Sequence, residues 1–254
     1  MSVLRYPGGK TRAVKILADY VPDDAYVILS PFTGGGSFEL YLRNSGKYIL
    51  GNDLFEPLYN FWFCLAEYQS RLIDEVTKLR PCTKEMFLEM RRKVMTTDVD
   101  SVTRAAYYFA INRCSFSGST LSGGYSAESA DKRFTESSIE RLRKFSPADF
   151  DIQNMDANEF IDMNVEYDFM YLDPPYFLGP GNKLYGKGGD LHSGFDHERL
   201  HTTLSTLPNW IMSYNDCAWV REKYSDYEIV PLTWSYGMNQ TKKSSEVLII
   251  SAIK

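Results

Sequence analysis

The chain has 254 residues, of which 44% are hydrophobic, and a formal net charge of −5. A chain of this length can bury a large core, and its ordinary content of Gly and Pro excludes a disordered or fibrous protein. It shows neither a signal peptide nor an apolar run long enough to cross a bilayer. We therefore expect no membrane partner and a cytoplasmic location, or a host intracellular one if the protein is viral. The four cysteines are scattered without metal-ligand spacing, so we expect neither a metal site nor a disulfide framework.

The N-terminal part of the chain alternates helix and strand patterns. We expect a short helix over 11–20, a buried strand over 26–30, a helix over 37–44 and a second strand over 48–51. A glycine-rich run follows the first strand, and Asp53 follows the second. This succession is the βαβ plan of nucleotide-binding sheets.

The middle of the chain is helical and basic. Long helical patterns run over 58–79, 84–94 and 102–112, and a loop rich in Ser and Gly follows over 115–129. Residues 71–144 carry 14 Lys and Arg against 10 Asp and Glu, whereas the rest of the chain carries 14 against 23. A basic insertion on an acidic body is the charge pattern of a segment that faces nucleic acid.

Strand and helix patterns alternate again after the insertion. The elements expected there are strands over 150–154, 169–172, 210–213 and 245–253 and a helix over 157–163. Asp196 has the position of an N-cap for a further helix. The loop over 177–194 is typical of a lid or binding loop. We therefore predict an α/β fold in which residues 1–56 and 148–254 form the sheet domain and residues 57–147 form a helical insertion.

Two motifs that contain glycines have both a structural and a functional interpretation. The turn over 31–36, Pro-Phe-Thr-Gly-Gly-Gly, lets the backbone approach a ligand, and Asp53 can hold both hydroxyls of a ribose. The alternative is an ordinary tight turn in a protein that binds no nucleotide. The run over 5–10, Arg-Tyr-Pro-Gly-Gly-Lys, is either an exposed turn or a means of bringing a cation and an aromatic ring to a cofactor. The chain lacks a P-loop and the pattern G-x-G-x-x-G, which disfavours a phosphate-binding loop and NAD.

The most specific motif is Asp173-Pro174-Pro175-Tyr176, which follows the apolar run over 169–172. It combines a carboxylate acceptor, two prolines without N–H donors and an aromatic ring. These groups lie at the carboxyl end of a strand, where open α/β sheets bind ligands. Such a set suits a flat, neutral, amino-bearing ring such as a nucleobase. A loop that only ends the strand is the alternative interpretation.

In this order the motifs resemble those of the Dam-type, or alpha-class, DNA adenine-N6 methyltransferases over nearly the whole chain. Further agreement comes from Asn52-Asp53, from 110–113 (Ala-Ile-Asn-Arg), from 213–216 (Ser-Tyr-Asn-Asp) and from the Lys-x-x-Glu-apolar segment over 243–250. The resemblance implies a Rossmann-like sheet that binds S-adenosylmethionine, releases S-adenosylhomocysteine, needs no metal and has duplex DNA as its partner. The implied cofactor-binding residues are Tyr6, Lys10, Pro31, Phe32, Thr33, Gly34, Gly36, Asp53, Asp156 and Asp173.

The resemblance also implies a chemistry for the Asp-Pro-Pro-Tyr motif. Asp173 and the Pro174 carbonyl would each accept one N–H bond from the amine of an adenine flipped out of the duplex, which aims its nitrogen at the methyl sulfonium. Tyr176 would stack on the ring. The insertion would read DNA, with Phe116 as a candidate wedge. The implied DNA-binding residues are Arg5, Arg113, Phe116, Ser117 and Leu121.

Leu121 departs from the pattern of the family. In members that read GATC this position is an arginine that contacts a guanine, a contact that leucine cannot make. The stretch over 184–200 resembles members that read CATG, so we favour CATG over GATC. Two other functions stay open: an RNA or protein-glutamine methyltransferase, whose members usually carry Asn-Pro-Pro-Tyr, and a DNA-binding module without activity. A monomeric or homodimeric state and a restriction-modification, viral or regulatory role also stay open.

Overall fold

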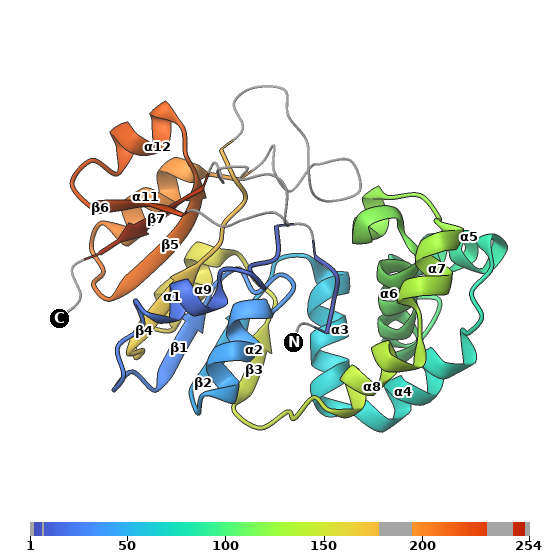
Figure 1. Cartoon of the computed structure of the whole chain (residues 1–254). Coiled ribbons are helices and arrows are strands. Elements are labelled where there is room, and N and C mark those ends of the chain that lie inside the picture. Colours follow the sequence, from blue (N-terminus) through green and yellow to red (C-terminus); the bar gives the residue numbers. More distant parts are fainter. Residues whose placement is uncertain (1–2, 7, 178–194, 233–245, 252–254) are drawn as a thin grey trace.

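A twisted sheet lies at the centre of the protein, whose computed structural model describes residues 3–6, 8–177, 195–232 and 246–251 (Figure 1). The seven strands have the order β3-β2-β1-β4-β5-β7-β6, and β7 runs antiparallel to both of its neighbours. The other neighbouring strands pair in parallel. The strands are β1 (Val27–Ser30), β2 (Tyr48–Asn52), β3 (Phe150–Gln153), β4 (Phe169–Leu172), β5 (Trp210–Asn215), β6 (Glu228–Leu232) and β7 (Glu246–Ile250). This architecture confirms the predicted Rossmann-like α/β fold.

Both faces of the sheet are buried. In β1, Ile28 packs into one hydrophobic cluster and Leu29 into the other, because neighbouring residues of a strand point to opposite faces. In β4, Tyr171 and Met170 divide between the two clusters in the same way. A strand that is covered on both faces has apolar side chains at every position, which is why these strands read as continuous apolar runs.

Each face of the sheet is covered by helices that contribute to one of these clusters. Helices of the first cluster include α1 (Val14–Ala18), α2 (Ser37–Asn44) and α3 (Glu56–Glu67). Helices of the second cluster are α9 (Ala157–Met163), α11 (His197–Leu204) and α12 (Ala218–Lys223). The carboxylate of Asp196 accepts a hydrogen bond of 2.9 Å from the Arg199 amide, which confirms the predicted N-cap of α11.

The helical block lies at one end of the sheet, next to α3 (Figure 1). Its helices are α4 (Gln69–Lys78), α5 (Lys84–Lys93), α6 (Ser101–Cys114), α7 (Ala127–Arg133) and α8 (Glu136–Arg143). The long helix α6 is central and packs against α3, α4, α5 and α7. Asp100 caps it by accepting hydrogen bonds from the Val102 and Thr103 amides at 3.1 and 3.3 Å.

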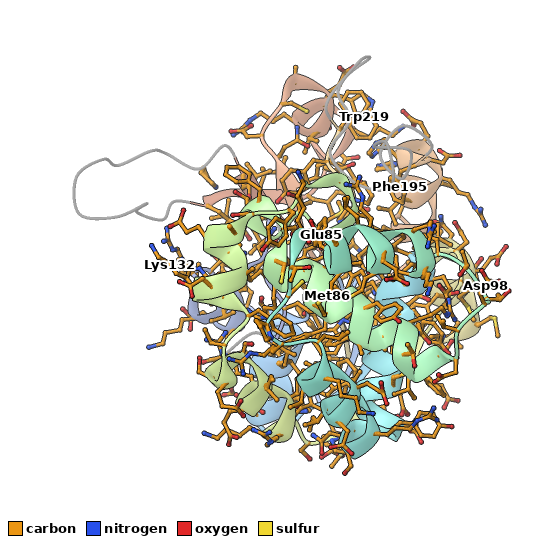
Figure 2. All side chains as sticks on the ribbon, turned by 90° about the vertical axis from the view of Figure 1, so that its right-hand side faces the viewer. Glu85, Met86, Asp98, Lys132, Phe195 and Trp219 are labelled. Carbon is orange, nitrogen blue, oxygen red and sulfur yellow. The ribbon has the colours of Figure 1, made fainter. Side chains whose placement is uncertain are left out.

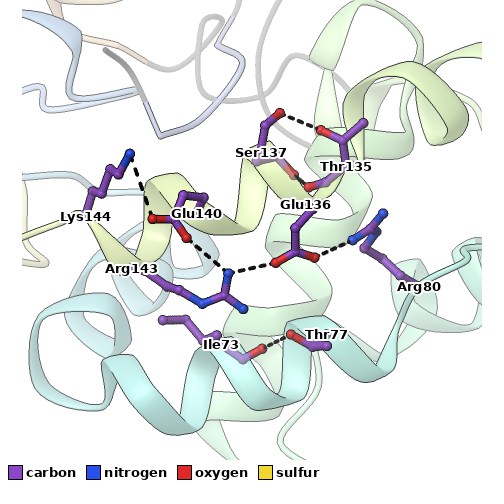
Figure 3. Close-up of polar contacts among 10 residues, drawn as sticks. Ile73, Thr77, Arg80, Thr135, Glu136, Ser137, Glu140, Arg143 and Lys144 are labelled. Atoms are coloured by element: carbon purple, nitrogen blue, oxygen red, sulfur yellow. Dashed lines mark hydrogen bonds and ion pairs between the residues drawn. The ribbon is translucent and has the colours of Figure 1, made fainter.

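Several ion pairs connect residues of this block (Figure 3). Glu136 lies 2.9 Å from Arg80 and 2.7 Å from Arg143, which also reaches Glu140 at 3.2 Å. These side chains are 31–63% exposed, and ion pairs open to solvent contribute roughly 0–1 kcal/mol each. The block is therefore stabilised chiefly by its buried apolar side chains, among them Phe109 and Leu142.

Several expected elements differ from the observed ones. The single helix expected over 58–79 is broken at Tyr68, where a non-helical backbone (φ −129°, ψ 34°) separates α3 from α4. The loop expected over 115–129 contains two short 3-10 turns and ends early, because Ser126 caps α7. The helices α8 and α12 and the strand β6 were not expected from the sequence.

Along the described parts of the chain, no helix is both long and apolar enough to span a lipid bilayer.

Candidate active site

A pocket opens at the carboxyl ends of β1, β2 and β4, the edge at which open α/β sheets bind ligands. It is lined by residues from the N-terminal run, the glycine turn, Asp53 and the Asp-Pro-Pro-Tyr motif. The structure therefore brings together motifs that are more than 160 residues apart in the chain: Lys10 and Asp173 differ by 163 positions. Each of the predicted cofactor-binding residues lines this pocket.

The glycine turn after β1 is shaped by the residues that pack on it. Gly34 and Gly36 have positive φ angles of 51° and 62°, a conformation that side chains disfavour. A Cβ atom on Gly35 would lie only 2.5 Å from the Cβ of Tyr6, and one on Gly36 would lie 2.8 Å from the Trp62 ring. The glycines thus let Tyr6 and Trp62 approach the turn, and the Trp62 indole donates a hydrogen bond of 3.0 Å to the Gly34 carbonyl.

Asp53 follows β2 and faces the same turn. Its two carboxylate oxygens accept hydrogen bonds of 2.9 Å from the Gly34 and Phe55 amides. Burial raises the pKa of Asp53 to about 6, although both amide hydrogen bonds act in the opposite direction. The carboxylate is therefore held in a fixed orientation and keeps further lone pairs for a ligand hydroxyl.

Asp173 follows β4 and makes a short ion pair with Lys10. The Lys10 ammonium lies 2.8 Å from Asp173 Oδ1 and 2.8 Å from the Tyr176 hydroxyl. Burial raises the pKa of Asp173, although Lys10 acts in the opposite direction. Burial alone would lower the pKa of Lys10, but the carboxylates of Asp173 and Glu246 outweigh it and raise this pKa.

Glu39 is a pocket residue that the sequence did not single out. It lies on α2, is 3% exposed, and accepts a hydrogen bond of 2.8 Å from the Ser30 hydroxyl. Burial raises its pKa to about 7, and the nearby Asp173 adds to this effect. The sequence feature that could have indicated it is an acidic residue between the apolar Phe38 and Leu40, just after the glycine turn.

Thr33 and Asp156 line the pocket but also have structural partners. The Thr33 hydroxyl donates to the Ser30 carbonyl at 3.3 Å and accepts from the Asn52 amide at 3.1 Å. Asp156 caps α9 by accepting hydrogen bonds from the Asn158 and Glu159 amides at 3.0 and 3.3 Å. These contacts fix the wall of the pocket between β1, β2 and α9.

The predicted DNA-binding residues divide into exposed and buried side chains. Phe116 is 68% exposed, and Ser117 beside it is also exposed, with a positive φ of 53°. Arg113 is 3% exposed and its guanidinium donates to the Val3 carbonyl, while burial lowers its pKa to about 9. Leu121 is 5% exposed and belongs to the core of the helical block. Neither buried side chain is presented to solvent in this structure, so a direct DNA contact by Arg113 or Leu121 stays a prediction that would need this turn to rearrange.

Arg5 and the exposed turn are joined by Asn112, which is fully buried. Its side-chain oxygen accepts a hydrogen bond of 3.0 Å from the Arg5 amide. Its amide nitrogen lies 2.5 Å from the Arg5 carbonyl oxygen and 3.3 Å from that of Gly118. A Cβ on Gly118 would lie 2.7 Å from the Cβ of Arg5, so glycine is required for this close packing. The N-terminal run therefore connects the turn that carries Phe116 to the pocket that contains Lys10.

Some basic residues of the helical block form ion pairs with acidic residues of the same block. Lys132 and Lys93 pair with Glu128 and Glu89 at 3.0 and 2.7 Å. Figure 2 views the molecule from the side of this block, with Lys132 at one margin of the face. The number of basic residues in a segment thus overstates the positive charge that it can offer to a phosphate backbone.

The predicted loop over 177–194 lies outside the described residues except for Phe177, and so does the part of the 184–200 stretch before Phe195. Lys243 of the C-terminal motif lies outside them as well. Within the described part of the chain, no group of three or more His, Cys, Asp or Glu side chains is arranged to hold a metal ion.

A Rossmann-like sheet whose glycine turn, acidic strand end and Asp-Pro-Pro-Tyr motif line one pocket defines an enzyme of the amino-methyltransferase class. Comparison with known families identifies it more closely: residues 6–238 match the model of the D12 class N6 adenine-specific DNA methyltransferases. The chain belongs to this family and is an adenine-specific DNA methyltransferase.

Two relatives are similar along most of their length. The type II methyltransferase M.CviBI of Paramecium bursaria Chlorella virus NC1A is 23% identical over 235 residues, which cover 89% of this chain and 86% of the relative. The type II methyltransferase M1.LlaDCHI of Lactococcus lactis subsp. cremoris is 25% identical over 247 residues, which cover 89% of this chain and 84% of the relative. Both relatives are named as type II methyltransferases.

Proposed function

We propose that this enzyme transfers a methyl group from S-adenosylmethionine to the N6 amine of an adenine that is flipped out of a short duplex target. The observation that carries the proposal is the shared pocket of the glycine turn, Asp53 and Asp173. Asp53 suits the ribose of a nucleoside cofactor, and Asp173 suits the amine of a nucleobase substrate. Both lie at the sheet edge where α/β proteins bind such ligands.

The cofactor would occupy the side of the pocket formed by β1 and β2. Asp53 would accept hydrogen bonds from the ribose hydroxyls, and its fixed orientation toward the glycine turn supports this role. Asp156 would lie by the cofactor's adenine. Tyr6 and Phe32 line the pocket and would make apolar contacts with the cofactor. Tyr6 is held in place by the glycine turn, and Phe32 by Phe195, whose ring centroid is 5.5 Å from its own.

The target adenine would meet the Asp-Pro-Pro-Tyr motif. An adenine amine is a poor nucleophile because its lone pair is delocalised into the ring. Asp173 and the Pro174 carbonyl would accept its two N–H groups and aim the lone pair at the sulfonium methyl group. Tyr176 would stack on the base and replace part of the stacking lost on flipping. The step would form an N–C bond and break the S–C bond, leave S-adenosylhomocysteine and release one amine proton to solvent, and it would require neither a metal nor a covalent enzyme intermediate.

The helical segment over 57–147 would be the target-recognition insertion. Phe116 is the best-placed wedge, because it is a large apolar side chain, 68% exposed, on the turn that Asn112 connects to Arg5. Burial of Leu121 supports the exclusion of a guanine contact at that position and so disfavours GATC. The preference for CATG rests on the resemblance of the stretch over 184–200. Methylating a plasmid and mapping the protected sites would test this preference.

One assay separates this function from its rivals. Purified enzyme would be incubated with labelled S-adenosylmethionine and, in turn, duplex DNA, RNA and a protein acceptor. We expect transfer to duplex DNA and recovery of the label as N6-methyladenine. Transfer only to RNA or to protein glutamine would support the first rival, and cofactor-independent DNA binding without transfer would support a silent binding module.

A further inference from the structure

Two arginines from distant parts of the chain come together beside the turn that carries Phe116. The Arg5 guanidinium donates hydrogen bonds of 3.4 Å to the Ser115 carbonyl and 3.5 Å to the Ser129 hydroxyl. Ser129 and Arg133 are four residues apart on α7, so they lie on the same face of this helix. Arg133 is exposed and Arg5 is partly exposed. Two guanidinium groups are therefore accessible on one side of the turn.

The acids of α7 do not neutralise this pair of arginines. Within the described part of the chain, neither guanidinium has a carboxylate at ion-pair distance. Glu128 is already paired with Lys132 at 3.0 Å. Asp131 does not face Arg133, because residues two positions apart on a helix do not face each other. Burial lowers the pKa of Arg5, and the charge of Arg133 lowers it further. The pair thus presents two positive charges.

A third arginine lies behind the pair. Arg113 is 3% exposed, and its guanidinium donates to the Val3 carbonyl. Its buried Nε has no hydrogen-bond partner among the residues that the structure describes. Burial lowers its pKa to about 9, and the charges of Arg141, Arg5 and Arg133 lower it further. A group with this pKa is cationic at neutral pH, so Arg113 adds to the positive potential around the pair.

A phosphate group fits such a cluster of arginines. Guanidinium groups bind phosphate through paired N–H donors, and the backbone of duplex DNA presents one phosphate at each nucleotide. Ser115 directly precedes Phe116, so a phosphate bound by Arg5 would lie next to the proposed wedge. An acidic protein segment is also an anion, but membership of a DNA methyltransferase family favours DNA.

We propose that Arg5 and Arg133 together hold one backbone phosphate of the target duplex beside the Phe116 turn, with Arg113 as a buried positive charge behind them. The site positions the duplex without reading its bases, because phosphate contacts carry no sequence information. The proposal rests on the proposed function in that duplex DNA is the substrate. It assigns a role to Arg133, which no sequence motif indicated.

Duplex binding measured at several salt concentrations tests the shared phosphate. The logarithm of the affinity falls with the logarithm of the salt concentration, with a slope of about 0.9 for each neutralised phosphate. We expect the double variant Arg5→Gln/Arg133→Gln to reduce this slope by about 0.9 and to weaken binding about tenfold at about 0.1 M salt. The loss should be equal for duplexes that contain or lack the target sequence, since no base is read.

The matched control is Arg71→Gln on α4. It removes the same charge from an exposed guanidinium that is already paired with Asp100 at 2.9 Å, and it should leave the slope unchanged. Arg133→Gln alone keeps the test independent of folding, because Arg133 is exposed. It should weaken duplex binding while the dissociation constant of S-adenosylmethionine stays unchanged, and Arg133→Lys should retain most of the affinity.

Three results would overturn the proposal. They are an unchanged salt slope in the double variant, a loss of affinity confined to one DNA sequence, and a fall in slope of about 1.8, which indicates two separate phosphates. Wild-type enzyme that binds duplex DNA with the expected salt dependence but transfers no methyl group would instead contradict the proposed function alone.

Discussion

The Lys10 ammonium donates a hydrogen bond of 2.8 Å to Asp173 Oδ1, although the two residues are 163 positions apart in the chain. The contact joins the N-terminal run to the Asp-Pro-Pro-Tyr motif. It also sets the ionisation of the carboxylate that is proposed to receive the adenine amine, because Lys10 opposes the effect of burial on the pKa of Asp173. Activity should therefore depend on pH through this pair.

Replacing Lys10 with Met removes that opposing charge. We expect the pKa of Asp173 to rise further, so that the carboxylate becomes protonated as the pH falls through a higher range than in the wild type. Turnover at neutral pH should decrease by about 10² or more, and the acidic limb of the pH–rate profile should move to higher pH. Lys15→Met, an exposed substitution on α1, serves as the control. An unchanged acidic limb would show that Lys10 does not govern Asp173.

Glu39 gives a prediction about stability. Its folded pKa of about 7 lies above the ordinary value of 4.5, so the folded protein binds a proton more tightly than the unfolded chain. This group therefore stabilises the fold below the unfolded pKa, and that stabilisation is lost as the pH rises through about 7. Glu39→Gln should be more stable than the wild type near pH 8, by up to about 3 kcal/mol. The difference should vanish near pH 4, below the unfolded pKa of 4.5. Urea unfolding at both pH values measures it.

A suitable control for that measurement is Glu159→Gln, an exposed position in the first turn of α9. It should change the free energy of unfolding little at either pH. If Glu39→Gln changed the free energy of unfolding by the same amount at both pH values, the folded and unfolded pKa of Glu39 would be equal, and burial would not raise it.

Phe116 should act on the DNA rather than on the cofactor. Phe116→Ala removes the exposed ring, so we expect less flipping of the target base and weaker DNA binding, with cofactor affinity unchanged. Fluorescence of 2-aminopurine at the target position reports flipping directly. Leu88→Ala removes another exposed apolar side chain of the helical block, 52% exposed on α5, and should leave flipping intact. An equal loss of base flipping in both variants would contradict the prediction that Phe116 inserts into the duplex.

Leu121→Arg should fail to convert the enzyme to GATC recognition. Leu121 is 5% exposed in the core of the helical block, so an arginine there would be a buried charge without a partner. We expect a loss of stability of about 3 kcal/mol or more in urea unfolding. A stable variant that methylates GATC would show that this turn rearranges when DNA binds.

The residues of the site could be predicted from the sequence better than the helices and contacts around them. The glycine turn, Asp53 and Asp173 follow apolar strands, and the carboxyl ends of parallel strands share one edge, so their convergence could be predicted. The break at Tyr68 could not, because the apolar pattern continues through it and tertiary packing decides where the helix ends. The burial of Arg113 could not be predicted either, because its partner is the carbonyl of Val3, which lies 110 positions earlier in the chain. Such long-range contacts leave no local pattern.

The central claim is that Asp173 directs methyl transfer to the amine of adenine, and analysis of methylated nucleosides tests it most directly. Wild-type enzyme and Asp173→Asn would be incubated with the same duplex at equal cofactor occupancy, and the digested DNA would be examined by mass spectrometry. We expect N6-methyldeoxyadenosine from the wild type and formation slower by about 10³ in the variant, whose cofactor affinity should stay within a few fold. Methyl groups on another base, or a variant as fast as the wild type, would contradict the claim.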